Sequence, residues 1–134
     1  MENQNTIMEL TANTTMYSSV KVETPEAKAL LFNAMNNPAY RIADCINKVI
    51  MVKDIFVETV ECVNKESGEV STCPRVVVID ADGVGYVAVS TGIYNAIRKV
   101  IAIFGEPTWE NPIPLEVKQI SKGDRKILTF NVKA

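Results

Sequence analysis

The feature that most constrains the fold is a long apolar segment at residues 47–64, NKVIMVKDIFVETVECVN, which contains no Gly and no Pro. Val and Ile dominate this segment, a composition typical of a single long strand. The alternation of its apolar positions changes phase near Lys53 and Asp54. Such a change predicts a β-bulge or a strongly coiled strand, and a long curved strand is what closure of a small β-barrel requires.

The rest of the chain supplies shorter strands and one clear helix. Hydrophobic runs bounded by the turns KESGE, ADG and KGD predict strands at residues 70–80, 84–89, 115–121 and 126–132. Pro74 predicts that the first of these strands lies at an edge of the sheet or contains a bulge, since proline has no backbone N–H to donate to a neighbouring strand. Apolar residues at helical spacing predict a helix over 92–104, which begins after Ser90 or Thr91 and ends at Gly105.

The order of these elements favours an all-β fold with one helix. We interpret it as an OB-fold, a five-stranded Greek-key barrel with a helix between strands 3 and 4. An SH3-like barrel or a small α+β sheet uses similar parts, and both remain alternatives. Residues 1–24 are polar and predict an N-terminal arm or a loosely attached strand, so the OB-fold domain is expected at residues 25–134. Within that domain, residues 29–35 suit either a short helix or a strand.

The composition argues against catalysis. The chain has no histidine, which excludes Ser-His and Cys-His catalytic pairs and the usual zinc enzyme sites. Cys45, Cys62 and Cys73 have no metal-binding spacing, so they are expected to be small buried hydrophobes in a reducing compartment. We therefore expect no enzyme, no metal and no cofactor. The lack of an apolar signal sequence or span predicts a soluble cytoplasmic protein with no membrane partner.

The charge is distributed unevenly, although the formal net charge is only −2. Residues 1–40 carry two lysines against four glutamates, a sum of −2, whereas residues 115–134 carry five cations against two acids, a sum of +3. The predicted terminal hairpin is therefore a basic patch that could follow phosphates, and a solvated hairpin tip is the alternative interpretation. Its candidate DNA-binding residues are Lys118, Lys122, Arg125 and Lys126.

Binding of single-stranded nucleic acid also needs aromatic faces, because bases stack on them. Tyr86 follows the ADG turn in mid-strand and is the first candidate, with packing in the core as the alternative. Tyr40 and Arg41 place a ring beside a charge in a predicted loop and are equally suited to a surface role or a binding role. Tyr94, on the apolar side of the predicted helix, is assigned to the core.

The long strand and its partner add three further candidates. Lys53 interrupts an otherwise apolar run and is either a cation on a face of the sheet or a bulge residue. Arg75 follows Pro74 in the partner strand and could lie on the same face of the sheet. Phe56 is the third candidate, although a core position also suits it. Phe104 is assigned to the core, and Trp109, in a proline-rich loop, is interpreted as a loop anchor or a partner contact.

Three stretches resemble the small single-stranded DNA-binding proteins of tailed bacteriophages, in particular those of Bacillus podoviruses that replicate by protein priming. These stretches are LFNAMNN, IADCINKVIMVKDIFVETVECVNKESGE and IDADGVGYVAVSTGIYNAI. The resemblance implies an OB-fold that coats single-stranded DNA during replication without sequence choice. It also implies that Tyr86 stacks on bases and that Lys53 meets phosphate.

The chain departs from these relatives in two respects. Valines and the run Asp54-Ile55-Phe56 stand in the long strand where the relatives carry tyrosines, which leaves Phe56 as the nearby aromatic residue. The sequence ends in NVKA and has no acidic C-terminal tail of the kind that bacterial single-stranded DNA-binding proteins use to recruit partners. Any recruitment of replication proteins is therefore expected to use another surface, such as the acidic N-terminal part.

Two functions follow from the sequence. The first is a non-catalytic protein that binds single-stranded DNA by stacking and phosphate contacts, with RNA as an open alternative ligand and with oligomerisation left open. The second is a small β-barrel interaction module that binds no nucleic acid and uses its apolar strands and the loop around Trp109. The chain has few cations that are not balanced by acidic residues. The first function therefore predicts moderate affinity for DNA, with base stacking contributing part of the binding free energy.

Overall fold

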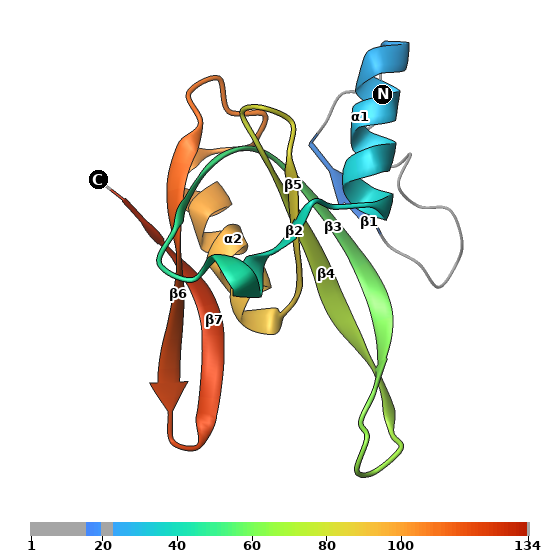
Figure 1. Cartoon of the computed structure of the whole chain (residues 1–134), viewed down its shortest axis with the longest axis vertical. Helices are drawn as coiled ribbons and strands as arrows, with labels where there is room; N and C mark the ends of the chain where they lie inside the picture. The colour runs from blue at the N-terminus through green and yellow to red at the C-terminus, as the bar shows by residue number, and fades with distance from the viewer. Residues whose placement is uncertain (1–15, 20–22, 134) are drawn as a thin grey trace.

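A computed structural model describes residues 16–19 and 23–133, and Figure 1 shows them as a strongly curled sheet with a helix on each side. Its elements, in chain order, are β1 (Met16–Ser18), α1 (Pro25–Asn36), β2 (Tyr40–Arg41), the 3-10 helix η2 (Ile42–Cys45), β3 (Val49–Val63), β4 (Val70–Asp80), β5 (Gly85–Val89), α2 (Thr91–Phe104), β6 (Ile113–Lys122) and β7 (Arg125–Val132). Each strand and the helix predicted beyond residue 47 is confirmed, with ends that differ by a few residues at most.

The long strand β3 is the centre of the sheet. The strands are ordered β2-β5-β4-β3-β6-β7, and β1 pairs with β3 outside this order. β3 pairs with β6 through residues 49–52 and with β4 through most of its remaining length, and the register shifts between Val52 and Asp54. The predicted bulge is therefore confirmed, and it marks the point where β3 turns from one neighbour to the other. In the described residues β7 does not pair back to β5, so the sheet is a curled half-barrel, consistent with an OB-like barrel.

The expectation of five strands and one helix is wrong. The ordered sheet has six strands, with β1 in addition, and there are two α-helices. The ambiguous segment after residue 24 is helical because its first turn is well capped: the Thr24 hydroxyl accepts a hydrogen bond from the Ala27 amide, and Pro25 occupies the first helical position. β2 was not predicted because two residues are too few to show a periodic pattern.

Both faces of β3 and β4 are buried, and this explains the irregular alternation of their sequences. On the inner face, Val76 and Val78 belong to a core with Ile93 and Ile97 of α2 and with Trp109. The outer face forms a smaller core with α1, which contains Leu31, Ala34, Phe56, Val77 and Ile79. The sequence of a strand that is covered on both faces is a continuous hydrophobic run, because neither of its two sets of alternate residues faces solvent.

The helix α2 is fixed at both ends. The Ser90 hydroxyl caps its start by accepting a hydrogen bond from the Ile93 amide, and Gly105, at a φ of 90°, ends it. The assignment of Phe104 to the core is wrong, because this ring is 46% exposed at the last turn. Trp109 is confirmed as a loop anchor: it is buried, and its indole N–H donates to the Gly105 carbonyl oxygen at 3.0 Å.

Three smaller expectations can also be compared with the structure. β4 lies between β5 and β3, so the expectation of an edge strand holds only for its first residues: Pro74 lies just beyond the residues that pair with β5, and its missing N–H faces no strand. All three cysteines are free thiols, but only Cys45 is buried. Within the described part of the chain, no helix is long and apolar enough to cross a membrane. The predicted arm at 1–24 lies mostly outside the described residues.

The closest approach between α2 and the sheet is at Gly92. A Cβ atom at this position would lie 2.3 Å from the backbone oxygen of Leu128 in β7 and 2.9 Å from a methyl group of Ile127. Glycine therefore lets the first turn of α2 rest directly on β7, and this contact spans the gap between the two ends of the curled sheet.

We predict that Gly92→Ala lowers the free energy of unfolding by about 1–3 kcal/mol, because backbone must shift to admit the methyl group. Chemical denaturation followed by circular dichroism measures the change. Asn95→Ala is the control, since it adds alanine at an exposed position of the same helix and should not destabilise the protein. An unchanged or raised midpoint for Gly92→Ala would contradict the close contact.

Candidate nucleic-acid interface

Two tyrosine rings stack on one another at the edge of the sheet. β2 pairs in parallel with β5, which sets Tyr40 beside Tyr86. The ring centroids are 5.3 Å apart and the ring planes differ by 24°. Tyr86 packs against the inner core, whereas Tyr40 is 55% exposed. We call this pair the tyrosine platform, because an exposed ring supported by a second ring has the geometry on which a base can stack.

The inner ring of the platform is held by Asp80 at the end of β4. The Tyr86 hydroxyl donates to Asp80 Oδ2 at 3.1 Å. The other oxygen, Oδ1, accepts hydrogen bonds from the backbone amides of Asp82 and Val84, each at 2.9 Å. Burial, together with the hydrogen bond to Asp80 and the negative charge of that carboxylate, raises the pKa of Tyr86 to about 12. Tyr86 therefore stays protonated and fixed in position.

Arg41 supplies a cation next to the platform. Its Nε lies 3.1 Å from Asp44 Oδ2, and both side chains are largely exposed. An exposed ion pair of this kind contributes little to stability, since water and salt screen it. The guanidinium therefore remains available to a phosphate, one residue along the chain from Tyr40.

The segment that follows β2 leads from the platform to the last hairpin. η2 contacts both β5 and β6. The Asn47 amide donates to the Val117 carbonyl oxygen at 2.7 Å, and Lys118 Nζ donates to Asn47 Oδ1 at 3.1 Å. Lys118 thus lies where this segment meets β6, and it is the first cation on the path from the platform along that strand.

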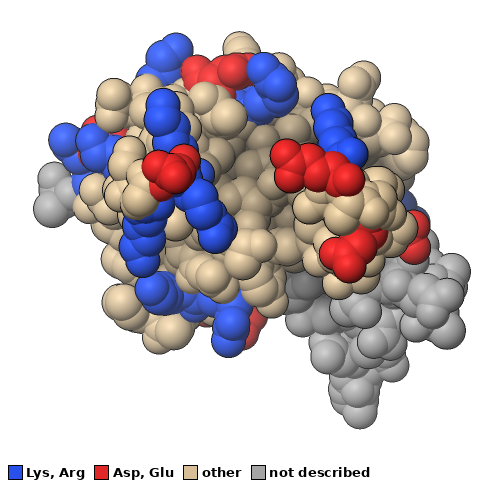
Figure 2. All heavy atoms as spheres, turned by 90° about the horizontal axis from the view of Figure 1, so that it is seen from below, with Lys and Arg blue, Asp and Glu red and all other residues tan. Residues whose placement is uncertain are grey.

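The β6–β7 hairpin carries the densest group of cations among the described residues. Lys122, Arg125 and Lys126 are all exposed at its tip, where Lys122 pairs with Arg125 and Ser121 with Lys126 in the ladder. Residues 118–126 hold four cations against Asp124, a sum of +3. Figure 2 shows these charges as a blue flank on the left, and we call residues 118–126 the basic hairpin.

The comparison with protein families agrees with this geometry. The model of the family described as phage single-stranded DNA-binding protein, of the Phi29 type, matches residues 10–133. The chain belongs to this family. It is therefore a protein of phage replication that binds single-stranded DNA, and the resemblance inferred from the sequence is confirmed. No curated protein and no solved structure matches the chain.

Not every residue expected at the interface of this phage protein lies near the platform. Phe56 has no exposed surface and is packed beneath α1, so the structure corrects it to a core residue with no ring face for a base. Arg75 bonds Glu58 at 2.9 Å and lies on the face of the sheet opposite Tyr86, since it shares its parity with Val77. Lys53 is the extra, half-buried residue of the bulge.

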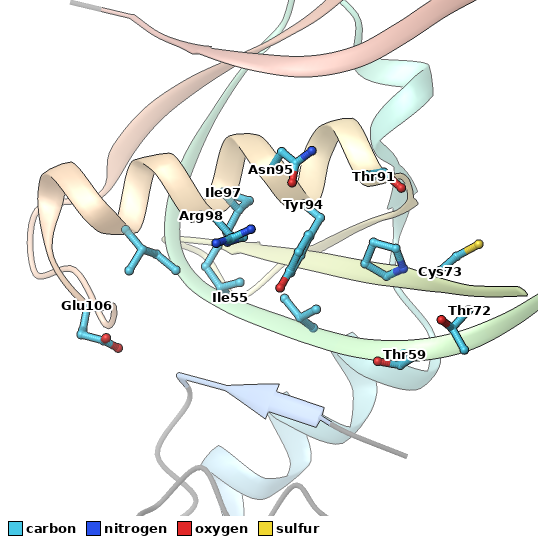
Figure 3. Close-up of a pocket in the computed structure, with 13 residues that line it drawn as sticks. Ile55, Thr59, Thr72, Cys73, Thr91, Tyr94, Asn95, Ile97, Arg98 and Glu106 are labelled. Atoms are coloured by element: carbon cyan, nitrogen blue, oxygen red, sulfur yellow. The ribbon is translucent and has the colours of Figure 1, made fainter. Parts of the chain in front are cut away.

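A groove that we had not predicted runs between α2 and the β3–β4 ribbon. Its volume is about 520 Å³, and Figure 3 shows Tyr94 and Arg98 beside it with Ile55 and Ile97 on its floor. The Arg98 guanidinium lies 5.8 Å from the centre of the Tyr94 ring, in cation–π range. Arg98 and Lys99 are the sole charges in α2, and this was the signal in the sequence that could have revealed the exposed side of the helix.

We predict that one tyrosine resists ionisation until about pH 12, and that Tyr86→Phe removes this late step. The pKa of Tyr86 is raised on folding, so its contribution to stability is complete below pH 10 and is lost as the pH rises from 10 through 12. Ultraviolet absorbance of tyrosinate measures the titration, and Tyr40→Phe is the matched control. Loss of the late step in the Tyr40→Phe variant instead would contradict the assignment.

Proposed function

We propose that the protein coats single-stranded DNA without strong sequence choice, with bases on the tyrosine platform and phosphates along the basic hairpin. The observation that carries the proposal is the exposed Tyr40 ring, stacked at 5.3 Å on a second ring that Asp80 holds in place. Every base has a π face and every nucleotide a phosphate, so stacking and charge together bind a strand whatever its sequence. Arg41 and Lys118 supply cations between the two ends of this path.

The order of the principal strands supports the more specific assignment to an OB-fold. The strands β5-β4-β3-β6-β7 are neighbours in that order, and α2 lies between the third and fourth of the five in the chain. OB-folds bind oligonucleotides on one face between two hairpin loops, which here are the β3–β4 and β6–β7 loops. In this assignment α1, β1 and β2 are additions to a five-stranded barrel that remains open on one side.

The same chemistry supports further proposals about the setting. The protein acts without catalysis, in the cytoplasm of the phage host, where its three free thiols stay reduced. Replication proteins are proposed as additional partners. RNA offers the same kinds of base ring and phosphate, so single-stranded RNA is proposed as an alternative ligand. In the described residues no cluster of three or more metal-ligating side chains is present.

We predict that Tyr40→Ala weakens binding of oligo-dT by about 5- to 150-fold, which corresponds to the loss of one base stack worth roughly 1–3 kcal/mol. Tyr40→Phe should bind like the wild type, because it keeps the ring. A fluorescence titration at fixed salt measures both. Phe32→Ala is the matched control, since this ring is 60% exposed on α1 and is not part of the stacked pair. Equal losses for Phe32→Ala and Tyr40→Ala would contradict the proposal.

A second prediction concerns salt. The triple substitution Lys122→Gln, Arg125→Gln and Lys126→Gln removes three cations, so the slope of log affinity against log salt should become shallower by about 2. Titrations at several salt concentrations measure the slope. The double variant Lys28→Gln and Lys99→Gln, which alters exposed lysines on α1 and α2 outside the proposed path, should keep the wild-type slope. An unchanged slope in the triple variant would exclude the basic hairpin from the interface.

A further inference from the structure

The β3–β4 hairpin extends beyond the rest of the sheet as a two-stranded arm. β5 pairs with β4 only from Arg75 onwards, and β1 pairs with β3 only through Glu58. Residues 59–74, which we call the acidic arm, therefore have no further strand on either edge within the described residues. An isolated ribbon of two strands has little stability of its own, so a surface that covers it would be stabilising.

The arm and the basic hairpin have opposite charges. The arm holds Glu61, Glu66 and Glu69 against Lys65, a sum of −2, whereas the basic hairpin sums to +3. In the described part of the chain, these three glutamates and the three cations at the hairpin tip form no ion pair with one another or with other residues. Figure 2 shows the two flanks on one face of the molecule, with an uncharged hollow between them.

Apolar surface accompanies these charges. Val63 and Val70 are cross-strand partners at the far end of the arm, and they are 62% and 60% exposed. The groove beside the root of the arm is lined by apolar groups of Val57, Ile97 and Ile101. The face thus combines an apolar groove, an exposed apolar pair and two flanks of opposite sign, a combination that suits a protein partner with the same features.

We propose that this face docks a second copy of the chain, so that the acidic arm of each copy lies against the basic hairpin of the other. A two-fold axis in the plane of the face, perpendicular to the line that joins the flanks, superimposes each basic flank on an acidic one. A two-fold axis parallel to the line that joins the flanks would instead place like charges against each other, at a cost of several kcal/mol. The charge pattern therefore selects one closed dimer, held by two identical contacts.

This dimer would cover the cations that the proposed DNA interface uses. Phosphates of single-stranded DNA and the carboxylates of the acidic arm therefore compete for Lys122, Arg125 and Lys126, and DNA should dissociate the dimer. This competition rests on the proposed function, whereas the self-association is measured without DNA. The two can therefore fail separately.

Sedimentation velocity of the full chain at low salt tests the proposal. We expect a dimer that dissociates as salt is raised, because exposed charge pairs are screened. The arm variant Glu61→Lys, Glu66→Lys and Glu69→Lys, and the hairpin variant Lys122→Glu, Arg125→Glu and Lys126→Glu, should each associate roughly a hundredfold more weakly. A monomeric wild type at low salt, or particles that keep growing with concentration, would overturn the proposed dimer.

Mixing the two charge-reversed variants gives a sharper test. One variant then has two basic flanks and the other two acidic flanks, so an equimolar mixture should form a dimer although neither variant does so alone. Recovery requires both chains to be folded, and it therefore excludes unfolding as the cause of the loss. A mixture that stays monomeric while both variants keep the wild-type circular dichroism spectrum would overturn the pairing of arm with hairpin.

Oligo-dT titrations of the same variants separate this proposal from the DNA interface. The arm variant should bind oligo-dT at least as tightly as the wild type, because its hairpin is intact and uncovered. The hairpin variant should lose binding. If the arm variant dimerises like the wild type, the dimer proposal fails and the DNA interface stands. If oligo-dT leaves the wild-type dimer intact at saturation, the shared use of the hairpin is refuted.

Discussion

The shift of register in β3 is the constraint on which the rest of the structure depends. The extra residue of a β-bulge bends its strand and increases the local twist. Before the shift between Val52 and Asp54, β3 pairs with β6, and after it β3 pairs with β4. The sheet therefore curls, α2 fits inside it, and the β3–β4 and β6–β7 hairpins project from the same side of the molecule.

Burial on both faces of β3 and β4 has a second effect, since it separates the two helices. α2 packs on the inner core and α1 on the outer core, and each takes alternate residues of the same strands. A Cβ atom at Gly85 in β5 would lie 3.3 Å from atoms of Ala34, where α1 rests on the sheet, just as Gly92 allows α2 to rest on β7. Small residues thus set how closely both helices approach the strands. The chain from α1 to η2 then passes along the edge of β5, where it places Tyr40.

The sequence was most informative where local signals were strong. Strand lengths, the bulge, the ADG turn and the capped helix α2 could all be predicted, because each depends on neighbouring residues. The sequence does not show which face of the sheet Phe56 lies on. In a strand that is buried on both faces, neither set of alternate residues is polar, so no set marks the side that faces solvent. The sequence offers Tyr40 and Arg41 as candidates for binding, but the stacking on Tyr86 depends on a two-residue parallel ladder between distant segments. The pattern of neighbouring residues in the sequence does not predict a contact between segments so far apart in the chain.

Asp80 carries a consequence for how variation can act on this protein. One of its oxygens closes the turn that starts β5, and the other positions the Tyr86 ring. The turn before β5 and the position of the Tyr86 ring therefore depend on one side chain, and a substitution that removes both oxygens removes both contacts. Selection for foldability and selection for ligand affinity meet at the same two atoms.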